Sequence, residues 1–281
     1  MKKSIKYISS VLTSLVLLSG CYDLDQYPAD KVNSGSFWQD EADAQEGMMG
    51  VYAAMKKDEV FSIYYTRDCL SDIGIGLNWG LYGFIEVAQG QSNSTTGLYK
   101  SVWQRLYDGI ARANTLITNV PSVDMSDDLK TQYQAEARFM RALYYNELLN
   151  LYGGVPLYDE TTSIEKEYDN MYKTRNTEAE VLDFILKDLE NACTYLPKTW
   201  DGGNKGRATK GAAYALKGKI LLYAKQYAEA TKALEEVRNG GYGYALNTDY
   251  AELFKPGGDE SSEMIFAVQN LGGASTAYGM P

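Results

Sequence analysis

Four aromatic rings and two arginines fall within residues 135–157, AEARFMRALYYNELLNLYGGVPL, and such a set can stack on a flat ligand such as a base or a sugar. The rings recur at helical spacing, which is more typical of a helix packed in a core. Arg138 and Arg141 then pair most simply with acids of an adjacent helix. Gly153 and Pro156 predict an ordinary helix end. We therefore expect core packing, with an aromatic ligand platform as the alternative.

Composition and spacing exclude several other classes of chemistry. The chain has 281 residues with 24 Tyr and no His, which excludes triads and zinc sites built on histidine. Its formal charge of −10 would repel a nucleic-acid backbone. Cys21, Cys69 and Cys193 contain no CxxC pair. Because the Walker, dinucleotide-binding and EF-hand spacings are also absent, we expect no cofactor and no metal.

The N-terminus has the features of a secretory signal. Three lysines lie in the first six residues, and residues 11–18 form an apolar run too short to span a membrane stably. The LSGC sequence at residues 18–21 resembles a bacterial lipobox, in which Cys21 becomes the lipidated first residue. The alternative is a plain secretory signal in which the cysteine is accidental.

These features divide the chain into three parts. We expect a lipoprotein signal peptide over residues 1–20, a lipidated tether over 21–35 and a helical domain over 36–281. Acylation of Cys21 contributes about 0.8 kcal/mol per buried methylene, so that more than one acyl chain, palmitate among them, anchors the domain firmly at a membrane.

Apolar periodicity predicts that the domain is mainly helical, and residues 62–98 form its longest irregular, glycine-rich segment. A loop of that length in a compact domain is usually functional or disordered, and its aromatic residues argue against disorder. The expected helices run from Ser36 to about 55, over 102–117 up to Pro121, from Ser126 to 152, from Thr177 to Pro197, from Thr209 to 223 and from 227 to about 237.

The last two helices form a hairpin whose sequence, ALKGKILLYAKQYAEATKALEEV, resembles a tetratricopeptide unit. In such a unit Tyr223, Tyr227, Ala230 and Leu234 would be buried between the paired helices. Residues 263–269, EMIFAVQ, are a candidate short strand. We expect a mainly α fold of tetratricopeptide-like hairpins forming a right-handed superhelical scaffold, with long irregular loops and few short strands.

Several segments, taken in order, resemble the SusD/RagB family of outer-membrane nutrient-binding lipoproteins. They are the lipobox at Cys21, WQRLYDGIARANTLI at 103–117, the helix of 135–157, GRATKGAAYALKGKILLY at 206–223 and EMIFAVQ at 263–269. The resemblance implies a surface scaffold that caps a SusC-like TonB-dependent transporter and hands it oligosaccharides or, in some members, peptides, without catalysis. Family members are usually much longer, so we expect a fragment or a truncated chain.

The resemblance also implies a shallow sugar platform on irregular surface segments, here at Asn78, Trp79 and Tyr82. An aromatic face can stack on a pyranose for about 0.5–1.5 kcal/mol beyond area burial, while an Asn amide bonds adjacent hydroxyls. Alternatively, Trp79 and Tyr82 only pack the loop onto the helices. A different class of function also remains open, which is a lipid-anchored tetratricopeptide scaffold that binds only a protein partner.

Overall fold

The computed structural model describes residues 37–56, 61, 68, 71–74, 84–162 and 172–267. The chain divides into two units, Met1–Trp38 and Gln39–Pro281, and the architecture below is that of the second unit. The signal peptide and the tether predicted for residues 1–35 lie outside the described residues, so these two boundaries stay predictions.

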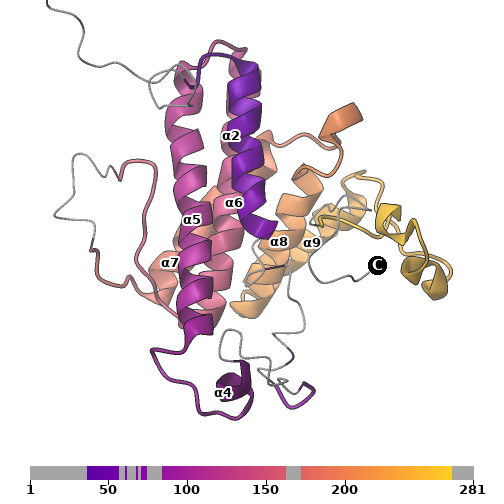
Figure 1. Ribbon diagram of the computed structural model, residues 1–281. Helices are drawn as coiled ribbons and strands as arrows, with labels where there is room; N and C mark the ends of the chain where they lie inside the picture. Colours follow the sequence, from indigo (N-terminus) through magenta and orange to yellow (C-terminus); the bar gives the residue numbers. More distant parts are fainter. Residues whose placement is uncertain are drawn as a thin grey trace, which may run out of the picture. The chain divides into compact units, whose positions relative to one another are not determined.

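Helices carry the fold of the second unit (Figure 1), and the part of it that is described contains no β-strand. The α-helices are α2 (Glu41–Ala53), α4 (Phe84–Ala88), α5 (Gly97–Asn119), α6 (Asp127–Tyr152), α7 (Glu178–Tyr195), α8 (Lys210–Tyr223) and α9 (Tyr227–Asn239). Short 3-10 helices are η1 (Ala54–Lys56), η3 (Val120–Ser122), η5 (Gly202–Asn204), η6 (Tyr250–Phe254) and η7 (Gly258–Glu260).

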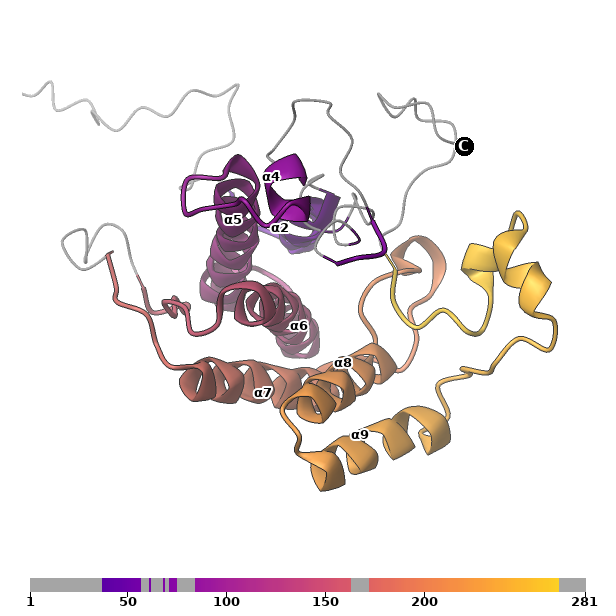
Figure 2. The same ribbon diagram turned by 90° about the horizontal axis from the view of Figure 1, so that it is seen from below.

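Consecutive helices pack against one another, so that α5, α6, α7, α8 and α9 follow in order across the unit (Figure 2). Helix α2 packs against both α5 and α6. This arrangement confirms the predicted mainly α fold with tetratricopeptide-like hairpins. None of the described helices combines the length and the apolar character that a membrane span requires.

Three helices begin at the residues predicted from the sequence. Ser126, Thr177 and Thr209 each accept a hydrogen bond from a backbone N–H in the first turn of α6, α7 and α8, respectively. Such caps satisfy backbone donors that have no partner inside the helix. Helix α6 ends at Gly153, whose φ of 69° lies in the region that glycine adopts most readily, as the sequence predicts.

The first helix starts later than the prediction placed it. Helix α2 begins at Glu41, with Asp40 rather than Ser36 as its cap. The Asp40 carboxylate accepts hydrogen bonds from the N–H groups of Ala42 and Asp43, at 2.9 and 3.2 Å. Because Asp43 also reaches back to the N–H of Asp40, the two residues form a reciprocal capping box that fixes the start of the helix.

Three of the four aromatic residues within 135–157 belong to the core, as their spacing predicts, while Tyr152 is half-buried. Phe139, Tyr144 and Tyr145 are each at most 1% exposed. The Tyr144 hydroxyl donates to the carbonyl of Val51 in α2, at 2.7 Å. Gly109 of α5 makes room for this ring, since a Cβ there would lie 2.6 Å from Tyr144 Cε2. These rings join three helices, so the alternative of an aromatic ligand platform is wrong for them.

Arg138 and Arg141 pair with an acid of the adjacent helix, as predicted. The Arg141 guanidinium donates two hydrogen bonds of 2.8 Å to Asp188 of α7 and one of 2.6 Å to Glu160. A fourth, also 2.6 Å, goes to the side-chain carbonyl of Asn114 in α5. Arg138 adds a 2.7 Å ion pair with Glu160. With Arg141 only 1% exposed, this network is a buried junction of α5, α6, α7 and the segment after α6.

The segment that follows α6 crosses back over α5 and α6. Its backbone carbonyls accept hydrogen bonds from three side chains, namely Tyr107 to Pro156 at 2.7 Å, and Asn114 and Tyr145 to Tyr158 at 3.0 Å. These bonds place Glu160, a few residues further along, against the two arginines.

The α8–α9 hairpin forms as predicted, with a three-residue turn at 224–226, but of the four residues predicted to be buried in it only Ala230 is buried. Tyr223, Tyr227 and Leu234 are 71, 61 and 41% exposed. The helices approach through small residues instead, since a Cβ on Gly218 would lie 2.6 Å from Leu234 Cδ2. Tyr223 and Tyr227 border the turn, beyond the point where the two helices face each other.

The candidate strand over 263–269 is also wrong in its described part, residues 263–267, which form turns and bends. The Ser261 hydroxyl accepts from the N–H of Glu263 at 3.2 Å, and the Ser261 carbonyl accepts from the N–H of Met264 at 3.0 Å. These local bonds take the place of the ladder that a strand would need.

Arg141→Met is expected to lower the free energy of unfolding by about 3–5 kcal/mol, because it leaves the carboxylate of Asp188 buried without its partner. Urea denaturation monitored by circular dichroism measures this change. Arg112→Met is the matched control, since its ion pair with Asp108 is about 40% exposed. That control should cost less than about 1 kcal/mol. Equal costs for the two variants would show that burial of the pair does not matter.

The stability of the fold should fall in acid through Glu160. Burial alone would raise the pKa of Glu160, but Arg141 and then Arg138 outweigh it and lower the pKa from 4.5 to about 2. The stabilisation is therefore complete above pH 4.5 and is lost as the pH falls toward 2. In Glu160→Gln, the free energy of unfolding should decline less over this interval than in the wild type.

Glu190→Gln provides the comparison for this acid titration, because the side chain of Glu190 is 65% exposed where it pairs with Lys217. It should follow the wild-type pH dependence between pH 5 and 2. A wild-type slope in Glu160→Gln would contradict the assignment.

Candidate functional site

Two adjoining hollows lie in the second unit, the first lined by residues of 198–209 and 242–267 and the second by residues of 246–262 alone. The first, which we call the aromatic cleft, has a volume of about 370 Å³ and is lined by Trp200, Arg207, Tyr242, Tyr244 and Phe266, among others. The second, the polar hollow, has a volume of about 570 Å³. Both are lined in part by Glu260 and Ser261. Their volumes lie in the range of small-molecule sites, about 300–1,000 Å³.

Arg207 positions one wall of the aromatic cleft. Its guanidinium carbon lies 4.1 Å from the ring centre of Trp200 and 4.8 Å from that of Tyr133, so the cation is held between two aromatic faces. Its Nε donates to Glu136 at 2.9 Å, and a second nitrogen also bonds this carboxylate. The indole N–H of Trp200 donates to the carbonyl of Ala208 at 2.7 Å. The ring of Trp200 is thus fixed by stacking and by one hydrogen bond.

Glu136 and Tyr52 connect this wall to the helical scaffold. The Tyr52 hydroxyl donates to the Glu136 carboxylate at 2.5 Å and accepts from the N–H of Ala208 at 2.7 Å. Burial, together with the charge of Glu136, raises the pKa of Tyr52 well above its usual value. The phenol therefore remains a donor, and α2, α6 and the 200–209 segment share one satisfied polar network.

Tyr242 and Tyr244, whose ring centres lie 6.0 Å apart, form another part of the lining of the aromatic cleft. The Tyr244 hydroxyl shares a hydrogen bond of 2.9 Å with Thr209. Gly211 of α8 allows the close approach, since a Cβ there would lie 2.5 Å from Tyr244 Cε2. The Lys198 ammonium lies 5.5 Å from the Tyr242 ring centre. Aromatic surface and hydrogen-bond donors therefore meet in the cleft.

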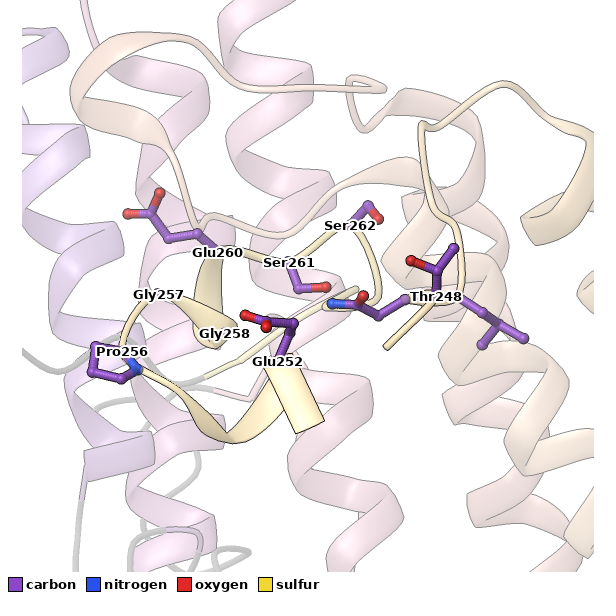
Figure 3. Close-up of a pocket in the computed structure, with 10 residues that line it drawn as sticks. Thr248, Glu252, Pro256, Gly257, Gly258, Glu260, Ser261 and Ser262 are labelled. Atoms are coloured by element: carbon purple, nitrogen blue, oxygen red, sulfur yellow. The ribbon is translucent and has the colours of Figure 1, made fainter. Parts of the chain in front are cut away.

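The polar hollow is built from two segments of the 246–262 region (Figure 3). Ala245 and Ser262 hold the segments together, through a backbone bond of 3.2 Å and a side-chain bond of 3.1 Å. The groups that can bond a ligand are carboxylates, hydroxyls and an amide. They belong to Asn247, Thr248, Glu252, Glu260, Ser261 and Ser262.

Sequence reasoning did not single out the residues of the aromatic cleft. Asn78, Trp79 and Tyr82, which it did select, lie outside the described residues, and their role in ligand binding stays a prediction. Lipidation of Cys21 likewise falls outside the described part of the chain. A usable signal for the cleft was the alternation of Tyr242 and Tyr244 after two glycines.

Comparison with known proteins gives a consistent result. A family model described as "Starch-binding associating with outer membrane", SusD-like, matches residues 24–222. SusD-like protein P2 of Formosa agariphila is 28% identical over 98% of this chain and 55% of its own length. Starch-binding protein SusD of Bacteroides thetaiotaomicron is 27% identical over 99% of this chain and 53% of its own. The chain thus spans about half the length of the curated relatives it matches.

Solved structures agree with the fold. A laminarin-binding SusD-like protein superposes with a TM-score of 0.73 at 30% identity, covering 82% of this chain and 51% of the other. A SusD-like protein from Bacteroides fragilis superposes equally well, with a TM-score of 0.73 at 28% identity, over 86% of this chain and 47% of the other.

Proposed function

Because the chain belongs to the SusD-like family, described as starch-binding and associating with the outer membrane, we propose that it captures glycans at the cell surface and passes them to a SusC-like TonB-dependent transporter. The observation that carries this proposal is the match of the family model to residues 24–222. One similar structure, that of a laminarin-binding SusD-like protein, supports a glycan as the ligand. Binding without catalysis is the function proposed.

The main ligand site in this proposal is the irregular segment that holds Asn78, Trp79 and Tyr82. An aromatic ring offers a flat apolar face that matches the C–H face of a sugar, and the amide of Asn78 can both donate to and accept from hydroxyl groups. This combination needs no metal, no cofactor and no titrating base, in keeping with a chain that lacks histidine.

Cys21 anchors the protein in the outer membrane in this proposal, through acyl chains on its thiol and amino group. The tether over residues 21–35 then sets how far the helical domain stands from the lipid. Anchoring concentrates the receptor beside its transporter in the plane of the membrane, so a weakly held glycan has a short path to the pore.

A protein-binding scaffold is the second candidate, and a specific surface favours it. Tyr223 and Tyr227 are exposed at the tip of the α8–α9 hairpin. Exposed aromatic side chains of this kind are enriched in protein–protein interfaces. A hollow of about 360 Å³ between α7, α8 and α9 adds charged side chains of both signs nearby.

A peptide ligand, as the family resemblance implies for some members, is a variant of the first proposal.

Trp79→Ala should weaken glycan binding about two- to tenfold, because it removes one stacking interaction. Affinity electrophoresis in gels containing laminarin or starch measures the effect as lost retardation. Tyr223→Ala is the control, since it removes an exposed aromatic ring at the hairpin tip and should leave retardation unchanged. Equal retardation of Trp79→Ala and wild type would remove Trp79 from the site. A transporter that copurifies with a wild-type protein that no glycan retards would favour the scaffold.

Cys21→Ala should release the protein from the outer-membrane fraction, because the acyl attachment point is lost. Fractionation of cells grown with radiolabelled palmitate measures both location and label. Cys193→Ala is the control, since this thiol is buried in α7 and should not be acylated. Label that persists in Cys21→Ala would place the lipid elsewhere.

A further inference from the structure

We propose that the aromatic cleft is a second ligand site, separate from Asn78, Trp79 and Tyr82, and that it binds the anionic sugar units of a glycan. Such units carry a carboxylate, as uronic acids do, or a sulfate ester. The inference rests on the proposed function only in taking the ligand to be a glycan.

The stacking surface of this site comes from two partly exposed rings, Trp200 and Tyr244, with the buried ring of Tyr242 beside the second. Trp200 is partly exposed in the cleft, and the guanidinium of Arg207 covers only one of its faces. Tyr244 is also partly exposed, and Tyr242 lies beside it. Rings held by hydrogen bonds and by stacking lose little conformational freedom when a ligand binds. A sugar ring in the cleft would therefore meet aromatic surfaces that are already held in place.

Lys198 supplies fixed N–H donors. Its ammonium donates to the carbonyl of Gly240 at 2.7 Å and lies over the ring of Tyr242. An ammonium has three N–H groups, and this bond uses one of them, so two remain to face an acceptor. A carboxylate or sulfate oxygen gains more from such a charged donor than a neutral sugar hydroxyl does.

Lys205 supplies a second cation, and a ligand can bind it at little cost in free energy. It lies 3.5 Å from Glu260, and these side chains are 73 and 72% exposed. An exposed pair of this kind contributes little to stability, so an incoming anion can replace Glu260 as the partner of Lys205. Glu260 is then the single described carboxylate of the cleft lining that competes with the ligand.

Arg207 contributes no unpaired charge to the cleft, so the net charge of the lining depends on its other charged residues. Its guanidinium is paired with the carboxylate of Glu136, which is fully buried. The residues that line the cleft therefore include two lysines and one exposed carboxylate, while a further carboxylate, that of Glu236, accepts from the Tyr242 hydroxyl at 3.1 Å from outside the lining. An excess of cations in the lining favours anionic over neutral ligands.

Single charge changes in the whole chain test this assignment. Lys205→Gln should weaken binding to polygalacturonate, which carries uronates, or to carrageenan, which carries sulfates, by about two- to fivefold. Glu260→Gln should strengthen binding to the same polymer by a similar factor, because it removes the competing carboxylate. Affinity electrophoresis measures both changes, and rising salt should reduce both.

Lys187→Gln is the matched control. Lys187 also forms an exposed ion pair, with Asp183, and its side chain is 71% exposed, so the substitution changes the net charge of the chain equally. It should bind like the wild type. Equal weakening by Lys187→Gln and Lys205→Gln would mean that only the overall charge matters, and it would overturn the proposal.

The probes also separate the two proposals. Retention by laminarin or starch but by neither acidic polymer would overturn the anionic site and leave the proposed glycan receptor standing. An unchanged affinity in Glu260→Gln would likewise overturn the site alone. If no polysaccharide retains the wild-type protein, both the anionic site and the proposed glycan receptor are contradicted. Whether the uronate or the sulfate polymer responds to the two substitutions identifies the source of the anion.

Discussion

The buried charge pair between Arg141 and Asp188 is the constraint on which the rest of the scaffold depends. Transfer of two charges from water into the interior is costly unless excellent geometry and further hydrogen bonds compensate it. Here α5, the segment after α6 and α7 all supply partners to one guanidinium. Each of these elements must therefore take a defined position for the charge to be satisfied, which couples three helices more specifically than apolar contacts alone.

A second guanidinium repeats this solution on the other side of α6. Arg207 brings the charge from the segment before α8, and α6 supplies the acid, Glu136. In the first pair α6 supplied the cation instead. Helix α6 thus has buried polar contacts toward α7 and toward the cleft, while Tyr144 packs against α2 and α5. The wall that carries Trp200 is rigid because the same network that satisfies Arg207 also fixes Ala208 and Tyr52.

The sequence predicted those features that depend on neighbouring residues. Ser126, Thr177 and Thr209 cap helices, and Gly153 ends one, because each acts within a single turn. The pairing of Arg141 with an adjacent helix could also be predicted, because Arg138 and Arg141 are spaced to lie on one face of their helix. The exposure of Tyr223 and Tyr227 did not follow, because apolar spacing does not show where a partner helix ends. The alternation of Tyr242 and Tyr244 indicates one part of the cleft, but the meeting of residues 198–209 with residues 242–267 could not be predicted, since it rests on hydrogen bonds that leave no periodic pattern.

The segments that line the aromatic cleft differ in how they are tied to the scaffold. Trp200 shares its network with the core, and Tyr242, Tyr244 and Phe266 also contact residues of the helices or their caps. The turns over 245–264, in contrast, are held largely by hydrogen bonds among themselves. Substitutions in these turns can therefore change the charge and shape of the cleft without disturbing the packing of the helices. Evolvability of the cleft lining, in this protein, is a consequence of where the buried charges are placed.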